Sequence, residues 1–557
     1  MKILLINPPI EDFYQTKIRQ EPLGLSYISA VLRREHKNVT LLDAMDNASH
    51  QTIECPDELK YLKSFYPSED ISPFKLFTRF QHFGLPYQTI ARLIKTCAPD
   101  IIGISANFSP YVKSSLKIAQ IARQLFPDVT IVLGGHHVSA VPSDLDEMPE
   151  VDFIVIGEGE YTFLNLIENL SERRPEKLKR IKGIAFRDNG KIRINPPADY
   201  VDPLDALPYP DRLTQEKSKM ILTSRGCPKN CQFCSVRHVM GRRVRLREIT
   251  AIIEEINYWV HSGVSHFDFE DDNLLFYPDR ARLLFKEIIN QVDIRKLSFS
   301  ALNGLDAEAL DQELLHLMKQ MHFTWLNLPL VSGHPEMQAQ INRNQSRTNF
   351  LEVVEAANRT GLKVVAYLIL GLPADSIDSM LADILLLAEK QVLIGPSIFY
   401  PPPGSPIYRT CLEKGLIRPR QYVTLRSSAI PVETDRFSRT DIVTLFRLVR
   451  IINYIKLLLD KSDQQHFRAE DFLKSRCQPD LFYSKSKLSA EELGLILLND
   501  LIINKQLKGI RFSGKRKQGF CYQRFEYDVS SLLVEKFMEN LKGRRIVGVE
   551  TDHSVEF

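Results

Sequence analysis

The feature that most constrains this fold is a repeated alternation of short apolar runs with segments of helical period. Over residues 1–170 the apolar runs predict five strands, and the segments between them predict helices. Strands that are apolar throughout and separated by helices indicate a parallel, doubly wound sheet that is buried on both faces. The expected strands are Lys2–Asn7, Asn38–Asp43, Asp100–Ser105, Val129–Leu133 and Asp152–Ile156. The expected helices include Pro22–Arg34, Thr89–Cys97, Val112–Leu125 and Tyr161–Leu170.

A second alternating series runs from about Met220 to Tyr408. Its six strand-and-helix units fit an open barrel, in which chemistry takes place at the carboxyl ends of the strands. The expected strands are Met220–Ser224, His266–Glu270, Leu297–Ala301, Thr324–Leu328, Val364–Leu370 and Gly395–Phe399. The expected helices include Leu246–Ser262, Pro278–Gln291, Asp306–Met321, Asn349–Thr360 and Ser379–Lys390.

The pattern predicts an α/β chain of three domains. Residues 1–200 form a doubly wound, Rossmann-like domain with an aromatic-rich insertion at about 48–88. Residues 205–415 form a partial (β/α)6 TIM-like barrel, and residues 416–557 form a smaller mixed α/β domain of unknown role. The proline-rich stretch Asp205–Asp211 is the expected first boundary.

Composition excludes several classes of protein. The chain has 557 residues, of which 44% are hydrophobic and 25% charged, as in an ordinary folded protein. A net charge of +3 gives no basic excess, so we expect no nucleic-acid partner. No apolar run reaches the roughly 18–20 residues that span a bilayer, so we expect no transmembrane segment. Eight cysteines are too sparse for a disulfide scaffold, and a cytoplasmic protein is expected.

Glycine-rich turns follow two of the strands in the first series. Gly134 and Gly135 follow one strand, and Gly157-Glu158-Gly159-Glu160 follows another. Ligands of open α/β sheets bind beyond the carboxyl ends of the strands, where these turns lie. No turn reads Gly-x-Gly-x-x-Gly, so the sequence gives no direct support for a nicotinamide or flavin site.

Three of the eight cysteines stand together. Cys227, Cys231 and Cys234 have the spacing Cys-x3-Cys-x2-Cys directly after the first strand of the second series. Three thiolates suit a four-iron four-sulfur cluster in which one iron keeps an open position, and an open position is where a cofactor or substrate binds. The alternative is a zinc site completed by His238. Zinc loops usually pair cysteines as two Cys-x2-Cys elbows, so we favour the cluster.

The triplet, with Phe233 before its last cysteine, resembles the signature of the radical S-adenosylmethionine superfamily. The resemblance extends through about Met220–Tyr408. Its other segments are Phe269-Glu270-Asp271-Asp272-Asn273, Asn303-Gly304-Leu305, Gly371-Leu372-Pro373 and Tyr400-Pro401-Pro402-Pro403-Gly404-Ser405-Pro406.

The N-terminal sheet resembles the cobalamin-binding domain that is fused to one branch of that superfamily. The matching segments are Asn7-Pro8-Pro9, Pro22-Leu23-Gly24-Leu25, Ile104-Ser105-Ala106, Gly134-Gly135-His136-His137 and Gly157-Glu158-Gly159-Glu160. The resemblance implies cobalamin contacts at Ser105, Gly134, Gly135, Gly157 and Glu158. Small residues at strand ends would leave room for this large ligand. Because Asp-x-His-x-x-Gly is absent, we predict that no histidine coordinates the cobalt.

The resemblance implies three cofactors: a four-iron four-sulfur cluster, S-adenosylmethionine and cobalamin. The cluster would cleave S-adenosylmethionine to a 5′-deoxyadenosyl radical, and methylcobalamin would give a methyl group to an unactivated carbon of the substrate. The expected function is therefore C-methyl transfer. The alternative is a radical cyclase, rearrangement or oxidative enzyme without net methyl transfer. An electron donor such as flavodoxin or ferredoxin is implied.

The resemblance also implies cofactor contacts at Asp271, Asp272, Asn303 and Gly371. The two aspartates follow a strand end, where the cofactor ammonium group needs an acceptor. Asp272 could instead cap the helix Pro278–Gln291. Asn303 could favour the turn before Gly304, and Gly371 could serve a turn alone.

Several residues keep two interpretations. Where related sequences often carry Glu-Ser-Gly, this chain has Val331-Ser332-Gly333-His334, so that carboxylate contact is not carried over. His334, His136 and His137 are ligands or plain loop residues, and we favour loop residues. Tyr27, Tyr111, Tyr367 and Tyr400 are expected to be packing residues. No residue is assigned as catalytic.

Two segments near the C-terminus each have two interpretations. The amphipathic segment Asp441–Lys461 lies on a membrane surface or packs against another domain, and we favour packing. The basic run Lys508–Lys517 either binds an anionic substrate or forms a solvated face of the protein, and we favour the solvated face. The substrate, a small molecule or a peptide, is expected between the first two domains, shaped by the region after Arg418 and by the insertion.

Overall fold

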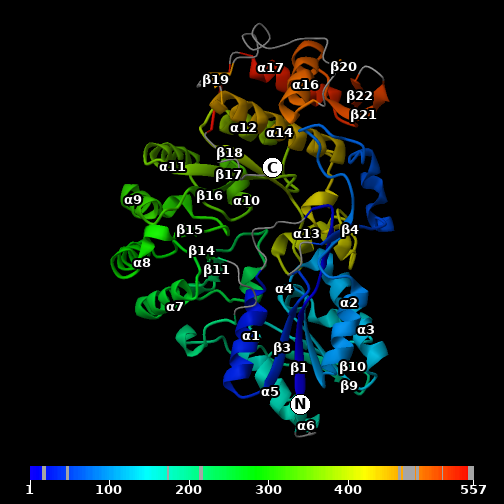
Figure 1. Ribbon diagram of the computed structural model, residues 1–557, viewed down its shortest axis with the longest axis vertical. Helices are drawn as coiled ribbons and strands as arrows, with labels where there is room; N and C mark the ends of the chain where they lie inside the picture. The colour runs from blue at the N-terminus through cyan, green and yellow to red at the C-terminus, as the bar shows by residue number, and fades with distance from the viewer. Residues whose placement is uncertain are drawn as a thin grey trace.

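Figure 1 shows the chain as a computed structural model in which three regions pack together. The N-terminal sheet lies at the bottom of the view, the second strand series at the left and the C-terminal helices at the top. The structure describes residues 1–14, 21–45, 49–171, 175–211, 217–461, 466–467, 483–484, 488–516, 519–542 and 544–549.

The N-terminal region is a seven-stranded sheet with the strand order β10-β9-β8-β7-β6-β1-β3. The five expected strands are present, and all five run parallel. They are β1 (Lys2–Asn7), β3 (Asn38–Asp43), β6 (Ile101–Ser105), β7 (Thr130–Gly134) and β8 (Phe153–Val155). The two further strands, β9 (Ile184–Asp188) and β10 (Lys191–Ile194), are antiparallel and were not predicted.

Helices cover both faces of this sheet, as the apolar strands predict. Successive β1 residues enter opposite cores because strand side chains alternate between the two faces. Ile3 and Leu5 lie in the core under α1 (Leu23–Arg34) and α5 (Glu160–Ser171). Leu4 and Ile6 lie in the other core, with α2 (Tyr87–Cys97) and α3 (Val112–Leu125).

The second region contains all six expected strands, arranged as two three-stranded parallel sheets. One has the order β11-β14-β15 and the other β16-β17-β18. The Leu305 amide donates to the Asn327 carbonyl (2.8 Å) and links the two. The strands are β11 (Ser218–Ile221), β14 (His266–Phe269), β15 (Ser298–Ser300), β16 (Trp325–Val331), β17 (Lys363–Leu370) and β18 (Leu393–Ile398).

Helices accompany these strands. They are α7 (Ile249–His261), α8 (Pro278–Gln291), α9 (Gln312–Gln320), α10 (Pro335–Gln340), α11 (Arg347–Arg359) and α12 (Ile377–Ala388). Of these, α7, α8, α9 and α11 lie along the left side of Figure 1. The expected helix Asp306–Met321 begins only at Gln312. The preceding Ala307–Ala309 is a 3-10 turn, and the Asp311 side chain accepts the Leu314 amide (3.0 Å) as the N-cap.

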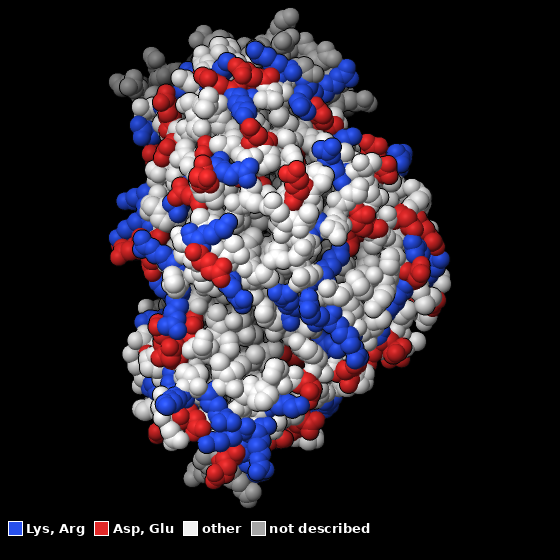
Figure 2. Space-filling view, turned by 180° about the vertical axis from the view of Figure 1, so that it is seen from behind, with Lys and Arg blue, Asp and Glu red and all other residues white. Residues whose placement is uncertain are grey.

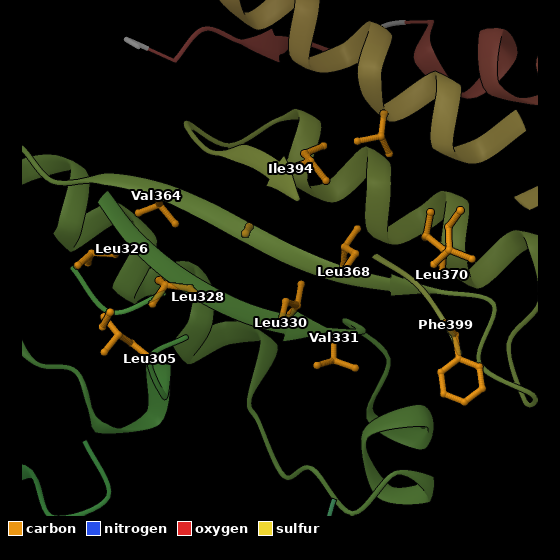
Figure 3. Packing of buried hydrophobic residues seen from close by; sticks show 14 of the residues in the cluster. Leu305, Leu326, Leu328, Leu330, Val331, Val364, Leu368, Leu370, Ile394 and Phe399 are labelled. Carbon is orange, nitrogen blue, oxygen red and sulfur yellow. The ribbon is translucent and has the colours of Figure 1, made fainter. Parts of the chain in front are cut away.

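Buried leucines hold β16, β17 and β18 together, as Figure 3 shows. They include Leu326, Leu328 and Leu330 of β16, each fully buried. β16 runs further than the predicted Thr324–Leu328, through a register shift between Pro329 and Val331. Val331 has φ of +67°, a strained conformation for a β-branched residue at the carboxyl end of a strand.

The C-terminal region is mixed α/β, with a long helix across the second region. That helix, α14 (Arg439–Lys461), packs on β18 and α12 with most of its apolar residues fully buried. The predicted packing is confirmed. The other elements include α16 (Ala490–Asn504), α17 (Ser531–Leu541), β19 (His466–Phe467), β20 (Tyr483–Ser484), β21 (Lys508–Arg516), β22 (Gly519–Glu526) and β23 (Ile546–Val547), while α13 (Pro406–Glu413) ends the second region.

The aromatic-rich insertion joins the N-terminal and C-terminal regions. Buried Arg447 of α14 donates to the Phe65 and Phe74 carbonyls (2.8 and 2.9 Å), and the Ile71 amide donates to the Ile510 carbonyl (3.0 Å). The regular elements of the insertion are β4 (His50–Thr52), the 3-10 helix Asp57–Ser64 and β5 (Gln81–Phe83), which pairs with β2 (Ile10–Asp12).

Charge is mixed over the face shown in Figure 2, where Lys and Arg alternate with Asp and Glu. Among the helices that the structure describes, none is long and apolar enough to cross a membrane. In the basic run Lys508–Lys517, Arg511 of β21 pairs with Gln523 of β22 (2.9 Å), and Lys517 lies outside the described residues.

Candidate functional site

The three clustered cysteines lie on a loop closed at its base by two short antiparallel strands. β12 (Ser224–Arg225) pairs with β13 (Arg245–Leu246), so that Arg225 stands opposite Arg245. Gly226 opens the loop with φ of +95°, and a Cβ there would lie 2.3 Å from the Arg243 carbonyl oxygen. Only glycine fits this conformation and this close approach.

The loop presents three free thiols. Cys231 is buried, and Cys227 and Cys234 are half-buried. Burial raises the pKa of Cys227, and it raises the pKa of Cys234 to about 11. Thiols of raised pKa stay protonated until a cation stabilises the thiolates, as iron does in an iron–sulfur cluster. The donor set therefore fits the expected cluster.

The zinc alternative would need His238 as a fourth ligand. Its Nε2 lies instead in hydrogen-bonding distance of the Gly404 carbonyl oxygen. In the described part of the chain, no three His, Cys, Asp or Glu side chains converge on one point as single-ion ligands do. The histidine is thus used to hold a neighbouring loop.

The two aspartates after β14 hold the base of the cysteine loop. Asp271 is buried and accepts from the Thr223 amide (3.1 Å) and hydroxyl (2.8 Å) and from the Ser224 hydroxyl. Asp272 accepts from the Gly226 amide (2.8 Å), and burial raises the pKa of Asp272 to about 6. Neither caps α8, whose N-cap residue is Tyr277.

Asn303 follows β15 and lies exposed beside the carboxylate of Glu270. Its Nδ2 donates to Glu270 Oε2 (2.8 Å), which joins the turns after β14 and β15. A carboxylate and an amide at neighbouring strand ends suit the ammonium and carboxylate of an amino acid moiety. This pair therefore fits the expected S-adenosylmethionine contact.

Gly371 is placed differently from the expectation. It has φ of +87°, and a Cβ there would lie 3.2 Å from Ile442 and 3.6 Å from Phe437. This side of its backbone is covered by the C-terminal region, so the structure favours the turn over a close approach to a cofactor.

A polar network inside the second region was missed by sequence reasoning. Phe267 and Phe269 of β14 stack in an aromatic cluster with Phe299, so Asp268 between them points to the opposite face. Asp268 Oδ1 accepts from Ser300 (2.6 Å), and Ser300 also contacts His266 Nε2 (3.0 Å). Asp268 Oδ2 is buried without a hydrogen-bond partner. A carboxylate flanked by two phenylalanines in a strand was the available signal.

The turn Val331–His334, where related sequences often carry a glutamate, is held by a carboxylate from another element. Asp383 of α12 accepts from the Ser332 hydroxyl and the Gly333 amide, both at 2.9 Å. His334 Nε2 lies 3.6 Å from Asp383 and 3.2 Å from the Ser379 carbonyl oxygen. His334 thus belongs to the support of its own turn, as the loop interpretation favours.

The carboxyl edge of the N-terminal sheet is lined by small residues. Ser105 of β6 stands beside Gly134 of β7 in the parallel register. A Cβ on Gly134 would have no heavy atom closer than 3.9 Å, and the same holds for Gly157. Gly135 differs, because its φ is +118° and a Cβ would lie 2.5 Å from Asn107. A Cβ at Gly134 or Gly157 would therefore meet its neighbours at ordinary van der Waals distance, so crowding by the protein does not account for glycine at these two positions.

The two histidines of this edge lie in the short helix α4 (His136–Ala140). His137 is buried against the ring of Tyr422 (4.5 Å between centroids), and its Nδ1 lies 3.0 Å from the Ser109 hydroxyl. Burial lowers the pKa of His137 to about 4, so the ring is neutral. The ring packs between elements, as the loop interpretation favours.

The carboxylate of Glu158 binds two arginines of the cysteine loop. Its carboxylate forms a two-bond pair with Arg245 (2.8 Å each) and accepts from Arg225 (3.1 Å). The side chain thus serves the junction with the cysteine loop, and the predicted cobalamin contact at Glu158 stays a prediction. A turn position shows which edge a residue occupies but not the direction of its side chain.

The expected tyrosines have packing and bracing roles. The Arg225 guanidinium lies over the Tyr27 ring (5.1 Å), and the Tyr111 hydroxyl donates to Asp12 (2.7 Å). Tyr367 of β17 is partly exposed, and its hydroxyl donates to Asn327 (3.0 Å). Tyr400 is also partly exposed.

The two edges face each other across the junction. A Cβ on Gly157 would lie 3.9 Å from the Val239 carbonyl oxygen, which follows the cysteine loop. A Cβ on Gly404, in the proline-rich turn after β18, would lie 2.9 Å from Ala140 of α4 and 3.2 Å from His238. The glycine-lined edge and the cysteine loop are therefore neighbours in space.

Family models match both edges. Residues 221–387 match the model described as "Radical SAM superfamily", and residues 78–167 match the model described as "B12 binding domain". The first match contains the three cysteines. The second contains Ser105, Gly134 and Gly157.

Relatives match most of the chain. An uncharacterised methyltransferase of Pyrococcus horikoshii is 27% identical over 82% of this chain and 93% of its own length. Cytidylyl-2-hydroxyethylphosphonate methyltransferase of Streptomyces wedmorensis is 26% identical over 75% of this chain and 83% of its own. The fold resembles that of the cobalamin-dependent S-adenosylmethionine radical enzyme OxsB, solved with aqua-cobalamin and S-adenosylmethionine. The TM-score is 0.59 and the identity 15%, over 97% of this chain and 78% of that one.

Proposed function

We propose C-methyl transfer as the reaction of this chain, which belongs to the cobalamin-binding radical S-adenosylmethionine enzymes of the methyltransferase-like branch. One observation carries the proposal: a three-thiol loop and a glycine-lined sheet edge face each other within one chain. When bound, the cluster with S-adenosylmethionine supplies a carbon-centred radical, and cobalamin supplies the methyl group. An unactivated carbon needs both, because it is too poor a nucleophile for direct methyl transfer.

The residues have separate tasks in this proposal. Cys227, Cys231 and Cys234 hold the cluster. Asn303 and Glu270 bind the amino acid part of S-adenosylmethionine at the strand ends. Asp271 and Asp272 fix the loop that carries the cysteines through the Thr223 and Gly226 amides. They therefore act on the cofactor through the loop.

Cobalamin fits the edge formed by Ser105, Gly134 and Gly157. Backbone without side chains lets a large ligand approach closely, and crowding by the protein does not account for glycine at Gly134 and Gly157. Gly135 supports this edge by its backbone conformation. No histidine is assigned to the cobalt, since His137 packs against Tyr422.

The chain divides at the junctions that carry these sites. We propose a cobalamin-binding domain at 1–200 with its insertion at about 48–88, a radical domain at 205–415 and a substrate-shaping domain at 416–557. The two parallel three-stranded sheets are interpreted as the halves of one partial (β/α)6 barrel. The substrate, a small molecule or a peptide, binds between barrel and sheet edge, and a flavodoxin or ferredoxin supplies electrons.

The reaction can be tested without knowing the substrate. The reconstituted enzyme is incubated anaerobically with a cell extract, a reductant and S-adenosylmethionine that carries a deuterated methyl group. The proposal predicts an extract compound that gains one labelled methyl group, with 5′-deoxyadenosine formed alongside. Formation of 5′-deoxyadenosine without label in any product would overturn methyl transfer and favour the cyclase or rearrangement alternative.

A further inference from the structure

Four charged side chains are buried together where the sheet edge meets the cysteine loop. Glu158 comes from the turn after β8 and Glu160 is the first residue of α5, whereas Arg225 and Arg245 come from β12 and β13. Their exposed fractions are 8%, 3%, 4% and 4%. Arg225 donates to Glu158 (3.1 Å) and to Glu160 (2.7 Å). We call these four residues the junction cluster.

The junction cluster binds the cysteine loop at both of its ends. Arg225 immediately precedes the loop, and Arg245 stands opposite it where the loop ends. Glu158 binds both guanidinium groups, and it also accepts from the Val201 amide (2.7 Å). One carboxylate from the N-terminal domain therefore fixes the start and the end of the loop.

Charge explains why these contacts are mutually dependent. Two adjacent guanidinium groups repel each other, and the two carboxylates between them compensate this repulsion. Burial disfavours the charged Arg225, but Glu160 and Glu158 outweigh this effect and raise the pKa of Arg225. A buried charge that loses its partner is strongly unfavourable, so each residue holds the others in place.

The junction cluster lies between the two expected cofactor positions. On one side, Gly157 directly precedes Glu158 at the glycine-lined edge of the sheet. On the other side, Gly226 directly follows Arg225, and its amide is held by Asp272. A bidentate ion pair has a fixed geometry, so it sets distance and orientation in addition to binding.

We propose that Glu158 is a positioning residue that fixes the cysteine loop relative to the cobalamin edge and so sets the geometry between the two metal centres. This inference rests on the proposed function, because it assumes that both centres are bound. The substrate would have to meet the radical source on one side and the methyl donor on the other, so a misplacement of either centre would cost much of the rate.

The test measures the separation of the two metal centres in the enzyme with both cofactors bound. The reduced cluster and cob(II)alamin are both paramagnetic, so their dipolar interaction in an EPR experiment reports their separation. The wild type is expected to give one well-defined separation. Glu158→Gln, which keeps shape but removes charge, is expected to lose that single separation while iron and cobalt contents stay unchanged.

A matched control removes a buried ion pair elsewhere in the barrel. Glu255 of α7 is 1% exposed and pairs with Arg247, and neither residue contacts Glu158 or Glu160 in the described ion pairs. Glu255→Gln is expected to keep the wild-type separation. If it broadens the separation as much as Glu158→Gln does, the positioning role is overturned.

A second variant separates positioning from stability. Glu158→Gln combined with Arg245→Met removes carboxylate and guanidinium together, so no unpaired buried charge remains. The double variant is expected to recover the unfolding temperature but not the single separation. If the separation recovers with stability, or if Glu158→Gln keeps it from the start, the inference fails. Failure to bind iron or cobalt in the wild type would instead refute the proposed function.

Discussion

The two facing edges of this molecule are built on opposite principles. The edge of the N-terminal sheet carries the small residues Ser105, Gly134 and Gly157, which place little side chain beside the strand ends. The edge of the second region offers reactive and charged side chains: thiols, Asp272 and the Glu270–Asn303 pair. The first selects a ligand by shape and the second by chemistry.

This difference teaches how each edge tolerates change. An edge that binds by shape is damaged by added volume and is insensitive to charge. An edge that binds by chemistry is damaged by removing one donor and is sensitive to protonation. The two edges should therefore fail independently, each losing its own cofactor.

The largest effect is expected at the cysteine loop. Cys231→Ala removes one of three cluster ligands, and we expect S-adenosylmethionine cleavage to fall by at least about 1,000-fold and bound iron to be lost. Cobalt retention should stay at the wild-type level. Cys97→Ala, at a half-buried thiol far from the loop in sequence, serves as the control and should keep its iron. Iron retained by Cys231→Ala would break the comparison.

Protonation should affect the second region. Asp375 is buried beneath the turn after β17 and accepts from the Leu372 amide (3.0 Å), and burial raises the pKa of Asp375 from 3.8 to about 7. A raised native pKa stabilises the fold below about pH 4, and this contribution is lost as the pH rises to about 7. Relative to the wild type, Asp375→Asn should gain stability over that range, by at most about 4 kcal/mol. Unfolding curves from pH 4 to 8 check this, and parallel profiles would contradict it.

Added volume should affect the sheet edge. Gly134 has no positive φ, and a Cβ there would have no heavy atom closer than 3.9 Å, so Gly134→Val should fold but weaken cobalamin binding about 10- to 100-fold. Iron content should not change. Gly103→Ala is the contrast, because its Cβ would lie 2.8 Å from Leu5 and should lower the unfolding temperature. Cobalamin titration followed by absorbance distinguishes them, and unchanged affinity in Gly134→Val would remove the shape argument.

The smallest effect is expected at the exposed amide of the second edge. Asn303→Ala removes the hydrogen bond to Glu270, and we expect S-adenosylmethionine affinity to fall about tenfold, as for one hydrogen bond to a charged group. Equilibrium binding to the reconstituted protein measures it. The exposed amide of Asn358, which donates to the Gln391 carbonyl oxygen, provides a control variant that should bind normally. Equal affinity in both variants would place the cofactor elsewhere.

Local patterns were sufficient to predict the strands and the two edges. All eleven expected strands of the two series are present because apolar runs and helical periods are properties of short segments. The antiparallel β9 and β10 were missed, although the alternation of charged and apolar residues in β10 is itself a strand signal. The helix Asp306–Met321 was predicted too long, because the N-cap at Asp311 starts the helix later than the apolar periodicity indicates.

Side-chain pairing could not be predicted, because it depends on elements far apart in the chain. Glu158 was placed on the correct edge, but its partners Arg225 and Arg245 lie 67 and 87 residues away. Gly371 lies beside Ile442 of α14, and the sequence does not reveal where α14 packs. Asp383 supports a turn 50 residues before it, which no motif indicates.

The central claim is that two metal centres occupy the two edges of one chain. Iron and cobalt are counted after anaerobic reconstitution with and without cobalamin, in the wild type, Cys231→Ala and Gly134→Val. We predict about four irons and one cobalt per chain in the wild type, loss of iron alone in the first variant and loss of cobalt alone in the second. Zinc in place of iron, or iron without retained cobalt in the wild type, would contradict the account.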